Sequence, residues 1–587
     1  MPTLEWIGKD KVVNHHLDVP YRVLERQYSY DESGKHTEDN GSENMIIHGD
    51  NLDALKALLP RYEGKVKCIY IDPPYNTGNE GWVYNDNVND PRIRKWLGEV
   101  VGKEGEDLSR HDKWLCMMYP RLKLLQRLLS DDGVIFISID DNEQYNLKAI
   151  CDEVFGANCF IGNISWQRTY SMRNDSKGIP AEVEHILVYS KCGGWIPNRL
   201  PRTDEMNENY SSIDGDPRPW SSVTISAPGA ATHQGMVYAI QHPITGLLMY
   251  PPAGRCWSYG QSQMLEFMNE WTEYELRVIE DYEKRCELCG NTAGVSVETK
   301  AIMLSKELSA ASLEATERYQ QGVRQERPWP WLYFTTNGRG GMRRKQYLDT
   351  SAGKVATNFW PHSEVGHTGE ATNELAQIFA GRSPFDTPKP SRLISRILQI
   401  ATDSNSVVLD SFAGSGTTAH AILNMNKADG GNRKFILVEM MDYADSITAE
   451  RVKRVIDGYG EGRQAIAGTG GNFSYYELGE PLMNGDVLNE NISTEKIREY
   501  IYFTDTKSRL PEPHSDEPYF MGVHINSAYY FYYEKQAVTT LNREFLHTVK
   551  TRADSYIIYA DLCTLSDTEL EKYHITFKKI PRDITKL

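Results

Sequence analysis

Short apolar runs alternate with amphipathic stretches in two parts of the chain, 44–191 and 386–484. In the first part, apolar runs at 45–48 and 66–71 flank a stretch whose leucines recur at helical spacing. The second part contains the apolar runs VVLD and KFILVE, again separated by a stretch of helical pattern. Strands that alternate with helices predict a parallel sheet with helices on both faces. The predicted fold class is therefore α/β, with a doubly wound, mostly parallel sheet.

The alternation stops in the middle of the chain, where Pro, Gly, Trp and Tyr become frequent. We interpret this middle part as a separate α+β insert, and the end of the chain, rich in Tyr and Phe, as a third region. The predicted segments are an N-terminal arm (1–43), the first half of the sheet domain (44–191), the insert (192–385), the second half of the sheet domain (386–484) and a C-terminal α+β domain (485–587).

Composition is typical of packed globular domains without a membrane segment. Of the 587 residues, 40% are hydrophobic, and no apolar run approaches the roughly 20 residues that span a bilayer. The nine cysteines are scattered along the chain, which favours reduced thiols in a cytosol. We therefore expect a cytoplasmic protein that does not contact a membrane.

The net charge of −17 argues mildly against a protein that coats nucleic acid, because phosphate binding requires Lys and Arg. A local basic face is still compatible with this total. Residues 324–345 hold six Lys and Arg residues and one acid, interleaved with Trp, Tyr and Phe. This composition is typical of segments that bind phosphates and bases, and a solvated loop over an aromatic core is the alternative. The candidate DNA contacts are Arg324, Arg339, Arg343 and Arg344.

The segment VVLDSFAGSGTTAHAIL, 407–423, combines a buried strand, a glycine turn and the start of a helix. Gly414 and Gly416 lack side chains, so a ligand can approach the backbone closely. Glu439 ends the next predicted strand, where a carboxylate can accept both hydroxyls of a ribose. A cofactor that contains a nucleoside is therefore expected. Thr417 stands where a P-loop has lysine, which disfavours ATP, whereas NAD and a plain strand-to-helix turn remain open.

The apolar run VKCIYI ends in Asp-Pro-Pro-Tyr. Asp72 lies where open α/β sheets place their ligands, and its carboxylate only accepts hydrogen bonds. The carbonyl of Pro73 is a second acceptor, held rigid by the proline ring. Two acceptors fit an –NH₂ group, and the ring of Tyr75 can stack on a nucleobase, worth about 1–3 kcal/mol per base. Acceptors on the amine hydrogens return electron density to nitrogen, so the motif predicts attack of a base amine on an electrophile such as a methyl sulfonium.

Four stretches occur in a fixed order: GDNLDALKALL, CIYIDPPYNTGNEGWVYND, GVIFISIDDNE and DSFAGSGTTAHA. Together they resemble the β group of DNA amino-methyltransferases, which use S-adenosylmethionine, and in particular the Mod subunits of type III restriction–modification systems. The resemblance is close over about 44–191 and 385–445. It is carried by Asp-Pro-Pro-Tyr, followed later in the chain by Phe-x-Gly-x-Gly.

The resemblance implies roles for individual residues. It assigns Asp72, Pro73, Pro74 and Tyr75 to the target amine. The residues that it assigns to the cofactor are Asp50, Asp410, Phe412, Ala413, Gly414, Gly416, Thr417 and Glu439, with Lys389 as a further contact in the stretch TPKP. In that stretch Pro388 replaces the usual Gln. Cys286 and Cys289 form only half of a zinc knuckle, so no metal site is predicted.

The resemblance implies methyl transfer from S-adenosylmethionine to the N6 amine of an adenine flipped out of a specific sequence of double-stranded DNA. Asp72 favours adenine over cytosine by resemblance, and an N4-cytosine methyltransferase is an alternative. A DNA-binding module with an inactive methyltransferase fold is another alternative. The motif order disfavours a methyltransferase of RNA or of a protein amide. The resemblance further implies target recognition by 192–385, a homodimer, a separate Res subunit, and dimerisation or partner docking for 485–587.

Overall fold

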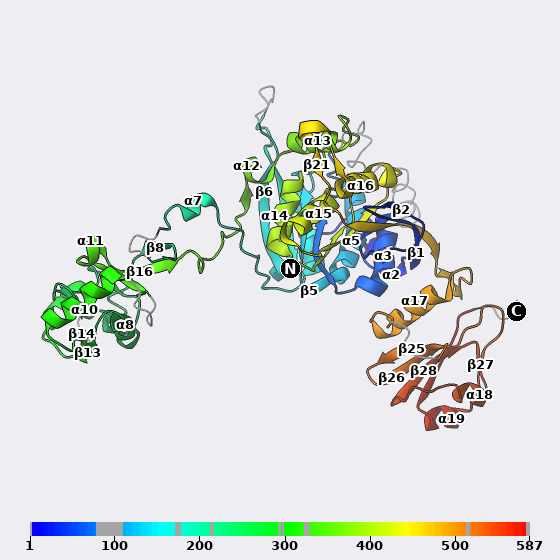
Figure 1. The fold of residues 1–587 in the computed structure, drawn as a ribbon. Helices are drawn as coiled ribbons and strands as arrows, with labels where there is room; N and C mark the ends of the chain where they lie inside the picture. The colour runs from blue at the N-terminus through cyan, green and yellow to red at the C-terminus, as the bar shows by residue number, and fades with distance from the viewer. Residues whose placement is uncertain are drawn as a thin grey trace. The chain divides into compact units, whose positions relative to one another are not determined.

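The computed structural model describes residues 3–77, 110–170, 178–211, 216–290, 295, 299–321, 329–511 and 517–582. The chain forms two compact units, one of Met1–Asn198 with Ala356–Leu587 and one of Arg199–Val355 (Figure 1). Each unit has a hydrophobic core of its own. Within the described ranges, no helix is both long and apolar enough to cross a membrane.

A large sheet lies at the centre of the first unit, and its described residues form 11 strands. The strands are, in order across the sheet, β17 (Phe359–Trp360), β6 (Phe160–Gln167), β7 (Val183–Ser190), β5 (Leu129–Ile139), β4 (Val66–Ile71), β18 (Val407–Asp410), β19 (Lys434–Glu439), β3 (Met45–His48), β22 (Asn472–Pro481), β1 (Arg22–Asp31) and β2 (Gly34–His36). The middle strands are parallel, whereas β7 and β1 run antiparallel to their neighbours. The middle strands are buried on both faces, which explains their continuous apolar runs.

Two layers of helices cover this sheet. One layer consists of α3 (Asn51–Tyr62), α5 (Arg110–Leu128) and α6 (Gln144–Phe155). The other consists of α14 (Ser391–Ala401), α15 (Thr417–Asp429) and α16 (Glu450–Asp457). The leucines of the first layer share a core with alternate residues of the middle strands. The predicted doubly wound, mostly parallel α/β fold is confirmed.

β4 and β18 are neighbours in the middle of the sheet although they are far apart in the chain. They pair in parallel, with Cys68 opposite Val408 and Ile69 opposite Leu409. β18 pairs in the same direction with β19, and β19 with β3. Because all four strands point the same way, their carboxyl ends meet at one edge of the sheet.

The prediction that residues 1–43 form an arm outside the sheet domain is wrong for β1 and β2, because these strands extend the sheet beyond β22. The ring of Tyr28 on β1 stacks on Tyr475 of β22, with ring centroids 5.1 Å apart. β1 is buried only around Tyr28 and Ser29 and is half-buried or exposed elsewhere. A strand near the end of a sheet lacks the long apolar run of a central strand, so its sequence resembled a polar arm.

The C-terminal part of the first unit contains α17 (Thr494–Thr506) and a second sheet. The strands of this sheet are β25 (Phe520–His524), β26 (Ser527–Phe531), β28 (Ser555–Ala560) and β30 (Ile575–Lys579). Tyrosine and phenylalanine side chains from β26 and β28 fill its core, which accounts for the aromatic composition of this part of the chain.

The second unit, Arg199–Val355, is shorter than the predicted insert of 192–385. Its elements include β8 (Trp220–Val223), β13 (Tyr274–Arg277), β14 (Ala301–Leu304), β15 (Leu332–Phe334), β16 (Met342–Tyr347), α8 (Gln261–Met268), α9 (Tyr282–Leu288) and α10 (Leu308–Gln321). Residues after 355 return to the first unit, where β17 pairs with β6. β17 has only two residues, too few to show a strand pattern in the sequence.

Candidate functional site

The four parallel strands β4, β18, β19 and β3 bring the two sequence motifs to one edge of the sheet. Asp72 follows the last residue of β4, and the glycine turn follows β18. Glu439 is the last residue of β19, and Asp50 lies two residues beyond β3. The structure thus brings together the residues that the sequence assigned to the target amine and to the cofactor, and these roles remain predictions.

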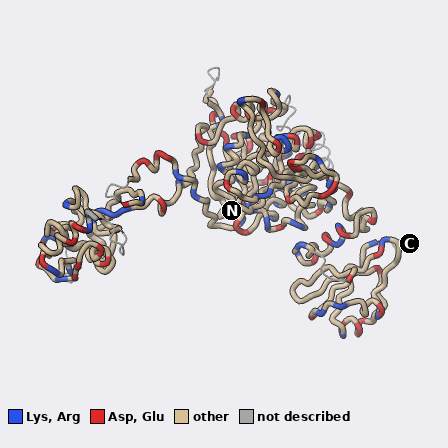
Figure 2. The backbone as a smooth tube through the Cα atoms, viewed as in Figure 1, with Lys and Arg blue, Asp and Glu red and all other residues tan. Residues whose placement is uncertain are grey.

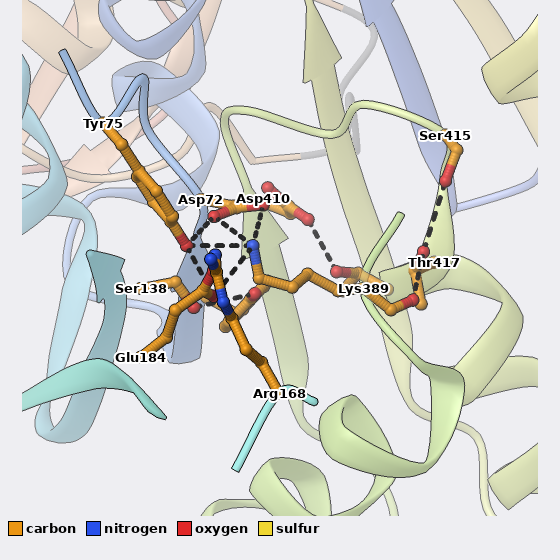
Figure 3. A network of polar contacts seen from close by, with 11 residues as sticks. Asp72, Tyr75, Ser138, Arg168, Glu184, Lys389, Asp410, Ser415 and Thr417 are labelled. Atoms are coloured by element: carbon orange, nitrogen blue, oxygen red, sulfur yellow. Dashed lines mark hydrogen bonds and ion pairs between the residues drawn. The ribbon is translucent and has the colours of Figure 1, made fainter. Parts of the chain in front are cut away.

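Lys389 connects the two motifs. Its Nζ atom lies 2.8 Å from Oδ1 and 2.7 Å from Oδ2 of Asp72, and it donates to the hydroxyl of Tyr75 at 2.9 Å (Figure 3). Its backbone carbonyl accepts a hydrogen bond from Oγ1 of Thr417 at 3.2 Å. The side chain of Lys389, predicted to contact the cofactor, therefore binds the Asp-Pro-Pro-Tyr motif, and the backbone of Lys389 binds the glycine turn.

Glu184 and Arg168 also belong to this cluster, and no motif in the sequence marks either of them. The hydroxyl of Tyr75 lies 2.9 Å from Oδ1 of Asp72 and 3.2 Å from Oε2 of Glu184. Arg168 binds the other oxygen, Oε1, of Glu184 at 2.5 Å. Glu184 lies at the start of β7, and only the antiparallel direction of β7 brings that end of the strand to the carboxyl edge of the parallel strands.

The charges of this cluster depend on one another. Burial raises the pKa of Asp72 above its ordinary value, and the Lys389 ammonium opposes that shift. Burial also favours the neutral form of Lys389, but the carboxylates of Asp72 and Glu184 outweigh it and raise the pKa of the ammonium. The pair is therefore ionised, because each charge makes the other tolerable in a buried position.

The backbone of the Asp-Pro-Pro-Tyr loop is held by α5. The indole nitrogen of Trp114 donates to the carbonyl of Pro74 at 2.7 Å. Asn76 adopts a left-handed conformation, with φ of 57°, and its side-chain amide donates to the carbonyl of Arg110 at 3.1 Å. These bonds orient the loop so that Asp72 and Tyr75 both face Lys389.

Two buried acids brace the glycine turn from inside. Asp410 accepts hydrogen bonds from the backbone N–H of Phe412 at 3.1 Å and from Oγ1 of Thr418 at 2.6 Å. Glu439 accepts from the N–H of Gly414 at 2.8 Å and from the N–H of Met441 at 3.0 Å. Burial raises the pKa of Asp410 to about 7 and that of Glu439 to about 8.

A π-helical turn, Ala444–Ala449, supports the same loop from the other side. Oγ1 of Thr448 donates to the carbonyl of Gly414 at 2.6 Å. Gly416 has φ of +80°, and a Cβ atom built on it would lie 3.0 Å from the carbonyl oxygen of Thr448. The protein itself therefore requires glycine at this position, independently of any ligand.

Arg451 was also missed by the sequence analysis. Its side chain is fully buried and donates to Oγ of Ser415 at 2.9 Å and to Oγ1 of Thr417 at 2.8 Å. A second nitrogen binds Glu374 at 3.2 Å. Because an arginine in an amphipathic helix usually faces solvent, nothing in the sequence marked it as part of the turn.

The remaining predicted cofactor residues line the same edge. Asp50 caps α3 by accepting from the N–H of Leu52 at 2.8 Å, and Arg121 lies 3.3 Å from its carboxylate. Phe412 is half-buried and Ala413 is buried within the turn.

The predicted DNA contacts lie in the second unit, except that Arg324 falls outside the described residues. Arg339 is exposed, and Arg343 and Arg344 are half-buried neighbours on β16, where Figure 2 shows a run of basic residues. The next residue, Lys345, is only 1% exposed and pairs with Asp216 at 2.9 Å. The basic stretch therefore divides into a structural lysine and arginines that are at least partly accessible.

The half zinc knuckle, Cys286 with Cys289, lies in the second unit. Cys286 is half-buried and Cys289 is buried. Across the described residues, no group of three or more His, Cys, Asp or Glu side chains is arranged to hold a metal ion.

Comparison with known proteins agrees with the motifs. A family model described as DNA methylase matches residues 66–450. The Mod subunit of the type III restriction–modification enzyme StyLTI from Salmonella typhimurium is 33% identical over 448 residues, covering 71% of this chain and 58% of that protein. The EcoPI Mod subunit from Escherichia phage P1 is 30% identical over 483 residues, covering 74% of this chain and 63% of that protein. The type II methyltransferase M.KpnI from Klebsiella pneumoniae is 29% identical over 421 residues, covering 70% of this chain and 84% of that protein. The chain thus matches 58–63% of the length of these two Mod subunits.

Substituting Gly416 with alanine should destabilise the first unit more than the same change at Gly430. Both glycines flank α15 with positive φ, at 80° and 70°, where alanine costs about 1–2 kcal/mol. Only Gly416 adds a close approach, since a Cβ on Gly430 meets nothing within 4 Å. Thermal unfolding of both variants measures the difference. Equal destabilisation would show that the proximity of Thr448 has no energetic effect.

Glu439→Gln should become more stable relative to the wild type as pH rises. The folded-state pKa of Glu439 is raised from 4.5 to about 8, so the folded protein holds the proton more tightly than the unfolded chain does. The stability that this proton contributes is complete below pH 4.5 and is lost as pH rises through about 8. Glutamine cannot ionise, so chemical denaturation at several pH values should show the variant gaining over this window. The exposed Glu461→Gln serves as control, and a pH-independent difference for Glu439→Gln would contradict the expectation.

Proposed function

The chain belongs to the family of DNA methylases, and we propose that it methylates the exocyclic N6 amine of adenine in duplex DNA. We propose S-adenosylmethionine as the methyl donor. The observation that carries the proposal is the pairing of β4 with β18, which ends the Asp72 motif and the glycine turn at the same edge of the sheet.

The residues at this edge fit a nucleoside-containing methyl donor. Each side-chain oxygen of Glu439 accepts one backbone N–H, and the carboxyl group keeps further hydrogen-bonding capacity for ribose hydroxyls. Gly414 and Gly416 present backbone without side chains, and Phe412 offers a half-buried ring. These residues, together with Asp50, would hold S-adenosylmethionine, which supplies an electrophilic methyl group when bound.

Asp72 and Tyr75 would prepare the base. The Asp72 carboxylate accepts hydrogen bonds from the amine and draws its lone pair out of the ring system, which makes nitrogen a better nucleophile. The ring of Tyr75 would stack on the base and fix its plane. A base inside a duplex cannot reach a carboxylate at the end of a buried strand, so the target must leave the helical stack.

Similarity to two Mod subunits supports a finer proposal. We propose that this chain is the modification component of a type III restriction–modification system, acts as a homodimer, and works with a separate Res subunit. The second unit, Arg199–Val355, would recognise the target sequence. Sequencing of modified bases in host DNA, with and without the gene, tests the activity. If the DNA contains N4-methylcytosine and no N6-methyladenine, the target is cytosine. If it contains no modified base that depends on the gene, the proposed methylation is refuted.

Asp72→Ala should lower methyl transfer by about 100-fold or more, because it removes an acceptor that acts on the reacting amine. Cofactor affinity should stay close to the wild type. Transfer of labelled methyl groups to plasmid DNA and calorimetry with S-adenosylmethionine measure the two quantities. Asp131→Ala is the control, since Asp131 is exposed and lies near the start of β5. Wild-type turnover in Asp72→Ala would remove Asp72 from the mechanism.

Arg343→Ala combined with Arg344→Ala should weaken DNA binding and flatten its salt dependence by about one unit of slope for each phosphate that is no longer neutralised. S-adenosylmethionine affinity should not change, because the residues proposed to hold the cofactor belong to the first unit. Fluorescence anisotropy at several salt concentrations measures the DNA affinity and its salt slope, and calorimetry measures the cofactor affinity. Arg277→Ala is the control, because Arg277 is an exposed arginine of the same unit that pairs with Glu275. An unchanged salt slope would place the DNA-binding residues elsewhere.

A further inference from the structure

We propose that, before DNA binds, the Lys389 ammonium occupies the place of the target amine on Asp72 and Tyr75, and that Glu184 takes the ammonium when the amine arrives. The inference rests on the proposed transfer of a methyl group to a base amine. It makes Lys389 a positioning residue of the target-base site and gives the cluster a built-in competitor for the substrate.

The contacts of Lys389 are those expected for the target. An ammonium has three N–H donors, and Nζ lies within 2.7–2.9 Å of three acceptors: both oxygens of Asp72 and the hydroxyl of Tyr75. An exocyclic amine needs acceptors at the same carboxylate. Since Nζ lies within hydrogen-bond distance of both carboxylate oxygens, the amine and the ammonium compete for one position.

Glu184 offers the displaced ammonium a second position nearby. Its Oε2 atom lies 3.7 Å from Nζ, so a shift of about 1 Å brings the pair to hydrogen-bond distance. Its other oxygen is held by Arg168, which fixes the carboxylate in place. The side chains of Lys389 and Glu184 are 10% and 6% exposed, so the ammonium would not need to enter water.

Charge balance favours a short movement over departure from the cluster. The cluster holds two carboxylates, Asp72 and Glu184, and two cations, Lys389 and Arg168. Removing the ammonium would leave an excess negative charge in a buried place, which is costly. Moving it from one carboxylate to the other keeps the total unchanged. The backbone of Lys389 can stay fixed on Thr417, because the flexible lysine stem allows the shift.

The test compares Lys389→Met, Lys389→Arg, Glu184→Gln and the double variant Lys389→Met with Glu184→Gln. Methyl transfer to plasmid DNA free of methylated adenine gives kcat and KM across a pH series. Calorimetry with S-adenosylmethionine gives cofactor affinity, and circular dichroism checks folding. The wild-type rate is measured first, because a wild type that methylates no DNA would refute the proposed function and not the Lys389 assignment.

In Lys389→Met, Asp72 loses the cation beside it, so the pKa of Asp72 rises. The acidic limb, which is the fall of kcat/KM at low pH as Asp72 takes up a proton, should therefore move up by about one pH unit or more. Lys389→Arg keeps the charge and should restore the limb. Cofactor affinity should stay at the wild-type value in both. An acidic limb of kcat/KM that does not move in Lys389→Met would overturn the proposal, whether or not cofactor affinity changes.

In Glu184→Gln, the ammonium has no second carboxylate and should stay on Asp72, so KM for DNA should rise by about tenfold with a smaller change in kcat. The rise should disappear in the Lys389→Met background, because no ammonium is left to compete. A purely structural role of Glu184 predicts the same rise in both backgrounds, and that result would overturn the hand-over. If Lys389→Met is poorly folded, Glu184→Gln alone still tests the proposal, because an unchanged KM for DNA in that variant would overturn the hand-over.

Discussion

The parallel pairing of β4 with β18 is the constraint on which the candidate site depends. Each strand ends in one motif, and the pairing of Ile69 with Leu409 sets the register between them. A slip of one residue would turn every side chain of a strand to the opposite face and bury the wrong groups. The order of the two halves along the chain does not matter to this pairing, since parallel strands need only a connection long enough to return. Here that connection includes the whole second unit.

Asp72, which follows β4 and is largely buried, creates an electrostatic problem that other segments solve. An isolated carboxylate in this position would take up a proton and lose the charge that a hydrogen-bond acceptor needs. Lys389 supplies the compensating charge for Asp72, and Arg168 does the same for Glu184. The chemistry of the four-residue motif therefore depends on β6, β7 and the segment before α14, which meet only in the folded protein.

The glycine turn is held by the protein on both sides. Asp410 and Glu439 bind its backbone N–H groups, whereas Thr448 and Arg451 bind its carbonyl and hydroxyl groups. A loop with so many fixed partners keeps its shape before any ligand binds, which lowers the entropy cost of binding. The burial that makes this possible also raises the pKa values of the two acids, so stability and pH are coupled at the same residues.

Local sequence patterns were enough to predict the fold class and the chemistry of the two motifs. Continuous apolar runs report burial on both faces, and motif residues such as Asp72 and Gly416 carry their chemistry locally. The partners of those residues became visible only in the folded protein. Glu184 and Arg451 are single polar residues whose partners lie far away in the chain, and no local pattern marks them. The stretch TPKP marked Lys389, but not its pairing with Asp72. The place of β1 in the sheet also became visible only in the folded protein. A strand near the end of a sheet buries too few side chains to show an alternation of apolar and polar residues. Periodicity records how much of each segment is buried, whereas pairing depends on which segments meet, and that is settled only when the chain packs.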